Sequence, residues 1–288
     1  MMDTGRMARF TPPTPRSRRL GKELRRIRDG AKLTLEDAGR LANCSPSRVA
    51  RVESGEIKVR PGDVMELLVA YRIPLDDEQS KALLAMARDI REQGWWQRLD
   101  TLPVKYATYI AYEAEAVDLR HFEPTLVPGL LQTEEYARAI IAIGRETDSE
   151  AIDQRLKARM RRQEVLTRDR RALRLWAIVS EAVLYCEVGS PEILREQMKH
   201  LVRLSAQANI TIQVLPFAAG AHLAVHGGFA ILSFEKNEQP LGYIETLGGE
   251  LFLESDADIL KLTNAWDHLR TLSLSPAESV KLIRERGK

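Results

Sequence analysis

Cysteine is scarce in this sequence, and its scarcity excludes several classes of protein. The 288 residues include two cysteines, Cys44 and Cys186, which lie far apart in the chain. A disulfide-stapled fold needs more cysteines, and a Cys-x-x-Cys zinc site needs them in close pairs. We therefore expect two reduced, buried thiols in a cytoplasmic protein.

The sequence also lacks the long apolar runs of a leader or a membrane span. Its first residues, MMDTGRMARFTPPTPRSRR, are basic and have no apolar segment of the signal-peptide kind. Residues 204–234 contain no Lys, Arg, Asp or Glu, but Gln207, Gln213 and Pro216 interrupt them. Short apolar runs of this kind are typical of buried strands and not of a span of about 20 residues. We expect no contact with a membrane.

Sequence motifs of catalysis are missing as well. Ser180-Glu181 lacks the glycines of a Gly-x-Ser-x-Gly elbow, and the pairs Gly227-Gly228 and Gly248-Gly249 lack the lysine of a phosphate-binding loop. His222 and His226 lie four residues apart in a glycine-rich stretch, without the helix or third ligand that a two-histidine metal site needs. We therefore expect no enzyme activity, no metal and no cofactor.

Two charged groups leave alternatives open. Glu113, Glu115 and Glu123 could form a carboxylate pair, although helix capping and surface charge explain them equally well. Residues 155–174 hold nine Lys and Arg against two acids. A helix over residues 152–166 would place three of these arginines on one face, as a solvated surface, a second contact with the DNA backbone or a dock for an acidic partner. The three are Arg155, Arg159 and Arg162.

What the chain does have is an uneven distribution of charge. The formal net charge is +2, but residues 1–75 carry 16 Lys and Arg against 9 Asp and Glu, a net of +7. The remaining residues carry 27 against 32, a net of −5. A basic first quarter on a mildly acidic body suggests a small part that binds a polyanion. With 44% hydrophobic residues, the chain can bury a sizeable core.

Short helices with clear boundaries are predicted in the basic quarter. Leu20, Leu24 and Ile27 form one apolar stripe of a first helix that ends near Gly30. Thr34 caps a second helix, and Asp37 completes a capping box. A third helix covers residues 46–54 and a fourth includes residues 64–68. This order is typical of a helix-turn-helix domain.

The third helix has one apolar and one polar face. Val49 and Val52 would anchor it to the bundle, while Ser47, Arg48, Ala50 and Arg51 would face solvent. Its N-cap, Ser45, precedes a proline at the first helical position, so free backbone N–H groups lie there for a phosphate. Arginine can contact guanine with two hydrogen bonds, whereas serine discriminates less between bases.

The segment KLTLEDAGRLANCSPSRVARVESGE, residues 32–56, resembles the Cro/CI-type (XRE) helix-turn-helix, which here covers residues 18–75. The resemblance implies that Pro46, Ser47 and Arg51 read base edges, with Ser45 and Arg48 near the DNA backbone. Leu35 stands where many members have a glutamine that contacts a phosphate, so Thr34 or the N-terminal arm would replace that contact. Arg18 and Arg19 complete the expected DNA-binding residues.

The rest of the chain predicts a larger α+β domain, after a linking helix over residues 76–100 that ends at Trp95-Trp96. The two tryptophans are interpreted as interdomain packing or a dimer contact. Helices are predicted at 113–119, 134–143, 152–166, 191–205, 256–271 and 276–286. Strands are predicted at 173–179, 182–187, 210–215, 229–234, 242–246 and 250–253.

Four phrases in this part are similar to a second family, the C-terminal domain of actinobacterial XRE regulators of the WhiJ type, which are antitoxin-like. They are YIAYEAEA (109–116), PGLLQTEEYARAII (128–141), QVLPF (213–217) and FLESDAD (252–258). The resemblance implies a transcription factor whose large domain binds a small partner protein encoded nearby. It implies no catalytic residues.

The sequence therefore predicts an N-terminal all-α helix-turn-helix domain plus a larger α+β C-terminal domain. The expected parts are a flexible basic arm (1–17), the DNA-binding domain (18–75), the linking helix (76–100) and a dimerisation and sensing domain (101–288). The expected function is sequence-specific regulation by a homodimer that binds double-stranded DNA at a palindromic operator. Two alternatives remain: an antitoxin-like protein that sequesters its partner, and a small-molecule-responsive regulator or vestigial enzyme with a pocket within residues 205–255.

Overall fold

A computed structural model gives the fold of the chain. The chain forms two compact units. The division falls within helix α6 (Val104–Glu115), after Tyr112. The structure describes residues 15–57, 59–91, 104–143, 148–169, 171–235 and 238–288. The predicted Trp95-Trp96 contact and most of the predicted arm lie outside these residues.

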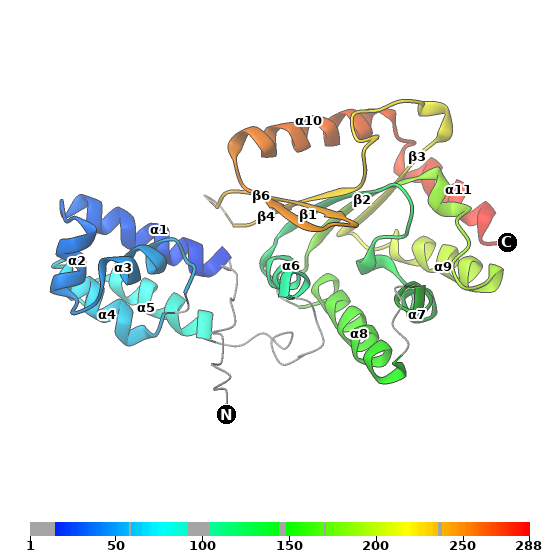
Figure 1. Ribbon diagram of the computed structural model, residues 1–288. Coiled ribbons are helices and arrows are strands. Elements are labelled where there is room, and N and C mark those ends of the chain that lie inside the picture. The colour runs from blue at the N-terminus through cyan, green and yellow to red at the C-terminus, as the bar shows by residue number, and fades with distance from the viewer. Residues whose placement is uncertain (1–14, 58, 92–103, 144–147, 170, 236–237) are drawn as a thin grey trace. The chain divides into compact units, whose positions relative to one another are not determined.

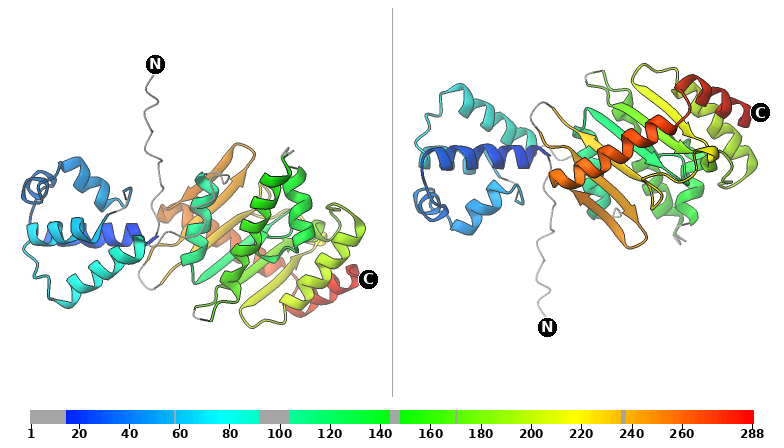
Figure 2. Two further views of the ribbon diagram at one scale, coloured as in Figure 1. Left: turned by 90° about the horizontal axis from the view of Figure 1, so that it is seen from below. Right: turned by 90° about the horizontal axis from the view of Figure 1, so that it is seen from above.

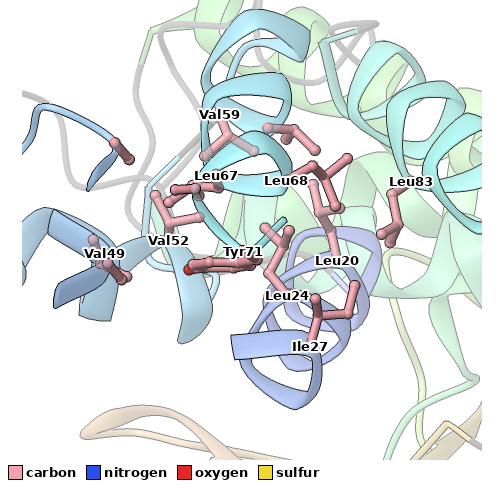
Figure 3. Packing of buried hydrophobic residues seen from close by; sticks show 14 of the residues in the cluster. Leu20, Leu24, Ile27, Val49, Val52, Val59, Leu67, Leu68, Tyr71 and Leu83 are labelled. Atoms are coloured by element: carbon pink, nitrogen blue, oxygen red, sulfur yellow. The ribbon is translucent and has the colours of Figure 1, made fainter. Parts of the chain in front are cut away.

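The N-terminal unit contains a bundle of short helices (Figure 1). They are α1 (Pro15–Gly30), α2 (Leu35–Leu41), α3 (Pro46–Glu53), α4 (Pro61–Ala70) and α5 (Glu78–Arg91). Their apolar faces meet in one core, in which Leu20 and Leu24 of α1 lie against Leu68 and Tyr71 (Figure 3). Leu83 of α5 joins the same core, so much of the predicted linking helix packs as part of the bundle.

The first helix begins earlier than the sequence indicates. Pro15, Arg16 and Ser17, which were predicted to belong to the flexible arm, form the first turn of α1. The cause is a tertiary contact: Ser17 is buried and its hydroxyl donates a hydrogen bond to the carbonyl oxygen of Gly55, at 3.1 Å.

The C-terminal unit is built on a six-stranded mixed sheet with the order β3-β2-β1-β4-β5-β6. β1 pairs parallel with β2 and β2 with β3, whereas the pairs β1–β4, β4–β5 and β5–β6 are antiparallel. The strands are β1 (Asp118–Glu123), β2 (Arg174–Ser180), β3 (Ile210–Leu215), β4 (Phe229–Ser233), β5 (Leu241–Thr246) and β6 (Gly249–Leu253). A sheet with both parallel and antiparallel strand pairs, accompanied by helices, belongs to the α+β class that the sequence predicts.

Helices cover both faces of the sheet (Figures 1 and 2). α10 (Asp256–Leu272) lies on one face, where Trp266 packs edge-on against Trp176 with ring centres 6.1 Å apart. On the other side lie α7 (Glu134–Ile143), α8 (Ser149–Arg162) and α9 (Pro191–Leu204). The remaining elements are α11 (Pro276–Arg286) and the 3-10 turns η2 (Gly129–Leu131), η3 (Gln163–Leu166), η4 (Glu181–Leu184) and η5 (Phe217–Ala219).

Two predictions of secondary structure are wrong. The segment 113–119, predicted as a helix, contains the end of α6 and the start of the central strand β1. Leu119 and Phe122 are three residues apart, which suggests a helix, but in β1 they lie on opposite faces of a sheet that is covered on both sides. The segment 182–187, predicted as a strand, contains most of the turn η4, because the Ser180 hydroxyl accepts a hydrogen bond from the N–H of Ala182 and bends the chain.

The cysteines also differ from expectation. Cys186 is exposed, and Cys44 is partly buried against the helical core. Burial raises the pKa of the Cys44 thiol.

Candidate nucleic-acid interface

The turn between α2 and α3 depends on a close backbone approach. A Cβ atom at Gly39 would lie 2.7 Å from the carbonyl oxygen of Cys44 and 3.0 Å from the nitrogen of Pro46. Asn43 takes a positive φ of 52° in the turn, a conformation that asparagine tolerates better than most residues. Glycine at 39 therefore lets the two helices meet across a tight turn.

The two faces of α3 have the division that the sequence predicts. Val49 and Val52 are buried, and their side chains point into the core of the bundle (Figure 3). Ala50, predicted to face solvent, is partly buried. The exposed residues from the N-cap of α3 to its last arginine are Ser45, Pro46, Ser47, Arg48 and Arg51. A helix anchored on one face thus presents two arginines and two serines on the other.

Ser45 caps α3 in the predicted manner. Its side-chain oxygen accepts a hydrogen bond from the N–H of Arg48 at 3.2 Å, and Pro46 occupies the first turn of the helix. The cap uses one of the free N–H groups, and the positive end of the helix dipole lies at this exposed terminus.

Thr34 forms the predicted capping box at the start of α2. Its hydroxyl accepts from the N–H of Asp37 at 3.1 Å, and an Asp37 oxygen accepts from the N–H of Thr34 at 3.3 Å. The hydrogen bond with Thr34, followed by that with Arg40, holds the pKa of the Asp37 carboxyl below its ordinary value. Thr34 is exposed, whereas Leu35 packs against the core and offers no polar atom.

Both exposed arginines of α3 have carboxylate partners that sequence reasoning missed. Arg48 Nη2 lies 3.1 Å from Asp63 Oδ1. Asp63 is itself held by the N–H of Arg60, which donates to its other oxygen at 2.8 Å as part of the cap of α4. Arg51 Nε lies 3.8 Å from Glu56 Oε2. The spacing of Asp63 after Arg60 predicts only the cap of α4, and no local pattern links Asp63 to Arg48.

A buried ionic group fixes the end of α3. Arg28 of α1 donates two hydrogen bonds to the Glu53 carboxylate, at 2.8 and 2.9 Å, and the Tyr71 hydroxyl donates to the same carboxylate at 3.2 Å. Hydrogen bonding to Glu53 raises the pKa of Arg28, and burial raises that of Tyr71. The group joins α1, α3 and the end of α4, so the C-terminal end of α3 is tied to two other helices of the bundle.

Arg18 and Arg19 lie in the first turns of α1, and Arg18 is partly buried while Arg19 is exposed. The backbone of Arg18 lies against Gly55, about 3 Å from the position of a Cβ there. The structure therefore places Arg18 at the C-terminal end of α3, one helix length away from Ser45.

The predicted face of arginines on α8 is largely turned inward. Arg162 is 7% exposed and donates two hydrogen bonds to Glu113, each at 2.8 Å, and Arg159 donates to Gln132 at 3.1 Å. Arg155 is partly buried. The buried Glu113 carboxylate requires a cation, so Arg162 serves the fold and is not a solvated or DNA-contacting side chain. Glu113 is likewise not paired with a second carboxylate.

The remaining candidate groups have ordinary structural partners. Glu123 lies 3.1 Å from His121, and His222 accepts a hydrogen bond from the N–H of Ala224 at 3.2 Å. Burial lowers the pKa of His222. In the part of the chain that the structure describes, no three His, Cys, Asp or Glu side chains gather as a metal site would require. Within the same residues, no helix has the length and apolar character to cross a bilayer.

A cleft of about 470 Å³ lies between α7 and α8, outside the 205–255 region in which the sequence placed a possible pocket. Leu156 and Met160 supply apolar side chains to its lining. Arg138 and Asp153, which form an ion pair at 2.7 Å, also line the cleft.

Comparison with known proteins identifies both parts of the chain. Residues 19–80 match the family described as helix-turn-helix domain, which agrees with the bundle of short helices. Residues 106–285 match the family described as domain of unknown function (DUF5753). No curated protein and no solved structure matches the chain. Because the second match spans more than half of its length, the chain belongs to the DUF5753 family and carries a helix-turn-helix DNA-binding domain before it.

Proposed function

We propose that this chain is a sequence-specific transcriptional regulator of the XRE type that reads a palindromic operator as a homodimer. One observation carries the proposal: α3 is anchored by Val49 and Val52 and presents Arg48 and Arg51 on its exposed face. An α-helix that lies in the major groove with arginine facing the bases can read guanine by two hydrogen bonds.

The residues divide into two roles. Pro46, Ser47 and Arg51 contact base edges, because they lie along the exposed face of α3. Ser45 and Arg48 contact phosphates near the helix terminus, where the dipole favours an anion. Thr34 contacts the DNA backbone, because Leu35 at the next position has no polar side-chain atom for a phosphate. Arg18 and Arg19 act at the other end of α3 and add attraction that does not depend on sequence.

Two copies on one duplex place their reading helices about 34 Å apart, which is one turn of DNA. The operator is therefore expected to be a palindrome with half-sites roughly one turn apart. The C-terminal unit supplies dimerisation in this proposal.

The experiment that tests the proposal is selection of binding duplexes from random DNA with the purified full chain. Binding to the selected duplex is then titrated in salt beside unrelated DNA. The proposal expects a palindromic selected sequence and a preference of about 10³ or more over unrelated DNA. Weak binding with the same salt dependence on every duplex would contradict it.

We further propose that the C-terminal unit binds a small partner protein encoded nearby. This proposal is supported by exposed apolar side chains in the segments that follow β2 and β3. Tyr185 and Phe217 have ring centres 6.1 Å apart, and Phe217, Leu223 and Val225 are 61, 61 and 64% exposed. Exposed apolar groups of this kind are typical of protein contacts. Co-purification with the product of a neighbouring gene, lost on changing Phe217 and Leu223 to serine, would support it.

Two other functions have observations in their favour. The exposed apolar group also suits an antitoxin-like protein that sequesters its partner, with DNA binding as autoregulation. In that case partner binding is tighter than operator binding and releases the DNA. The cleft between α7 and α8 suits a small-molecule effector instead. A thermal shift with metabolites that is abolished by Met160→Trp would favour the effector.

A further inference from the structure

The C-terminal end of α3 has a defined backbone geometry. Gly55 has a φ of 74°, its N–H donates to the carbonyl oxygen of Val52 at 3.0 Å, and the next N–H, of Glu56, donates to that of Arg51 at 2.9 Å. These two bonds are those of a Schellman motif, which ends a helix with a glycine in the left-handed region. A Cβ at Gly55 would also lie 2.9 Å from backbone atoms of Ser17 and Arg18, so position 55 has no room for a residue larger than glycine.

The motif places the side chains of Arg51 and Glu56 next to each other. In a Schellman motif these two positions usually share an apolar contact. Here they carry opposite charges, and Arg51 Nε lies 3.8 Å from Glu56 Oε2, with side chains 55 and 46% exposed. The backbone that ends the reading helix thus also holds a carboxylate beside its last exposed arginine.

The atoms used differ between the two arginines of α3. Arg48 donates a hydrogen bond to Asp63 from its terminal nitrogen Nη2, so one of its guanidinium donors is already in use. Glu56 is nearest to Arg51 at Nε, and their distance of 3.8 Å makes the pair a contact between charges and not a hydrogen bond. Two donors from one guanidinium can bind O6 and N7 of a guanine together. The arrangement therefore favours Arg51 as the base reader and Arg48 as the phosphate contact.

We propose that Glu56 is a positioning residue that determines the base specificity of Arg51. It orients the guanidinium before DNA arrives, and it competes with DNA phosphates for the same cation. A specific complex keeps the Nε contact and adds the guanine contact, whereas a non-specific complex must release Glu56 to reach a phosphate. This inference rests on the proposed function.

The test compares Glu56→Gln with Glu23→Gln in the full chain. Glu23 pairs with Arg26 on α1 at 3.0 Å, so the control removes the same charge from an arginine partner outside α3. For Glu56→Gln, affinity for unrelated DNA should rise about two- to fivefold. The slope of log K against log salt should steepen by about 0.9, because one more arginine can neutralise a phosphate. Operator affinity should change by less than about twofold in Glu56→Gln. Glu23→Gln should have a smaller effect than Glu56→Gln on both the affinity for unrelated DNA and the salt slope.

A second readout separates positioning from a general effect of charge. Single base-pair changes in the selected operator show which pair loses its preference in Arg51→Ala. Glu56→Gln should lower discrimination at that pair by about two- to fivefold and leave the other pairs unchanged. Glu56→Ala should do the same, which guards against a residual hydrogen bond from the glutamine.

The outcomes separate this inference from the proposed function. If the chain prefers its operator but Glu56→Gln lowers discrimination at every pair, or at none, the role of Glu56 is overturned and the regulator remains. If the unchanged chain shows no preference between duplexes, both are overturned.

Discussion

Arg28 and Glu53 form a buried, doubly hydrogen-bonded ion pair that joins the first helix of the bundle to the end of α3. The side chains are 9 and 4% exposed, and Tyr71 adds a third hydrogen bond to the carboxylate. Each charge of the pair neutralises the other, so the loss of one partner leaves the other charge unpaired in the protein interior.

Glu53→Gln should therefore destabilise the N-terminal bundle by about 3–5 kcal/mol. Guanidinium unfolding, followed through hydrogen exchange of the α3 amides, measures the change. The matched control is Glu23→Gln, which removes an exposed partner of Arg26 and should cost less than about 1 kcal/mol. Equal losses in the two variants would show that the buried pair contributes no more than a surface pair.

Gly39→Ala should destabilise the turn between α2 and α3, because its Cβ would meet the Cys44 carbonyl oxygen at 2.7 Å. We expect a loss of about 1–3 kcal/mol and weaker operator binding. Gly30→Ala is the control, since a Cβ at Gly30 has no atom within 4 Å. Thermal unfolding of both variants checks the prediction, and a normal melting temperature for Gly39→Ala would contradict it.

The stability of the chain should fall in acid partly through its helix caps. The Ser275 hydroxyl holds the pKa of Glu278 below its ordinary value, and the Thr34 hydroxyl does so for Asp37. A lowered pKa in the folded state stabilises the fold above the ordinary carboxyl range, which is near pH 4. That stabilisation is lost as the pH falls through the lowered values. Urea midpoints from pH 7 to below pH 3 measure it, and Glu278→Gln should lose less on acidification than the unchanged chain.

Arg51→Ala should cost about 1–3 kcal/mol in operator binding and relax preference at one base pair. Unrelated DNA should be bound nearly as before. Arg26→Ala, on α1 and exposed, is the control for removal of one positive charge. A normal operator affinity for Arg51→Ala would show that α3 is not the reading helix. Competition titrations at constant salt decide the matter.

Deletion of residues 1–14 should weaken binding to all duplexes by similar factors. The segment carries Arg6 and Arg9, and each phosphate contact that is lost flattens the slope of log K against log salt by about 0.9. The deletion stops before α1, so the Ser17 contact with Gly55 remains. A loss confined to the operator would instead indicate that the arm reads bases.

Local patterns predicted the helical bundle well, because its helices carry their own caps and apolar stripes. Thr34 and Ser45 mark helix starts, and Leu20, Leu24 and Ile27 mark a buried face, all from neighbouring residues. These features need no distant partner, so the exposed face of α3 could be deduced as well.

The contacts that depend on distant residues could not be read in this way. Glu113 looks like a surface acid until Arg162, 49 residues later, folds against it. β1 has the apolar spacing of a helix, and only its neighbours β2 and β4 make it a strand. The ion pair of Arg48 with Asp63 likewise requires α4 to pack beside α3.

The last residues of the chain close the outer edge of the sheet. The N–H of Leu274 donates to the carbonyl oxygen of Val214 in β3 at 2.9 Å, and the Ser279 hydroxyl accepts from the N–H of Val214, also at 2.9 Å. During synthesis the N-terminal unit, which extends to Tyr112, has all its residues before β1 begins at Asp118, whereas the β3 edge of the sheet needs residues up to Ser279. Domains generally fold as units from the N-terminus, so we expect the helix-turn-helix domain to fold while the strands of the sheet are still being synthesised.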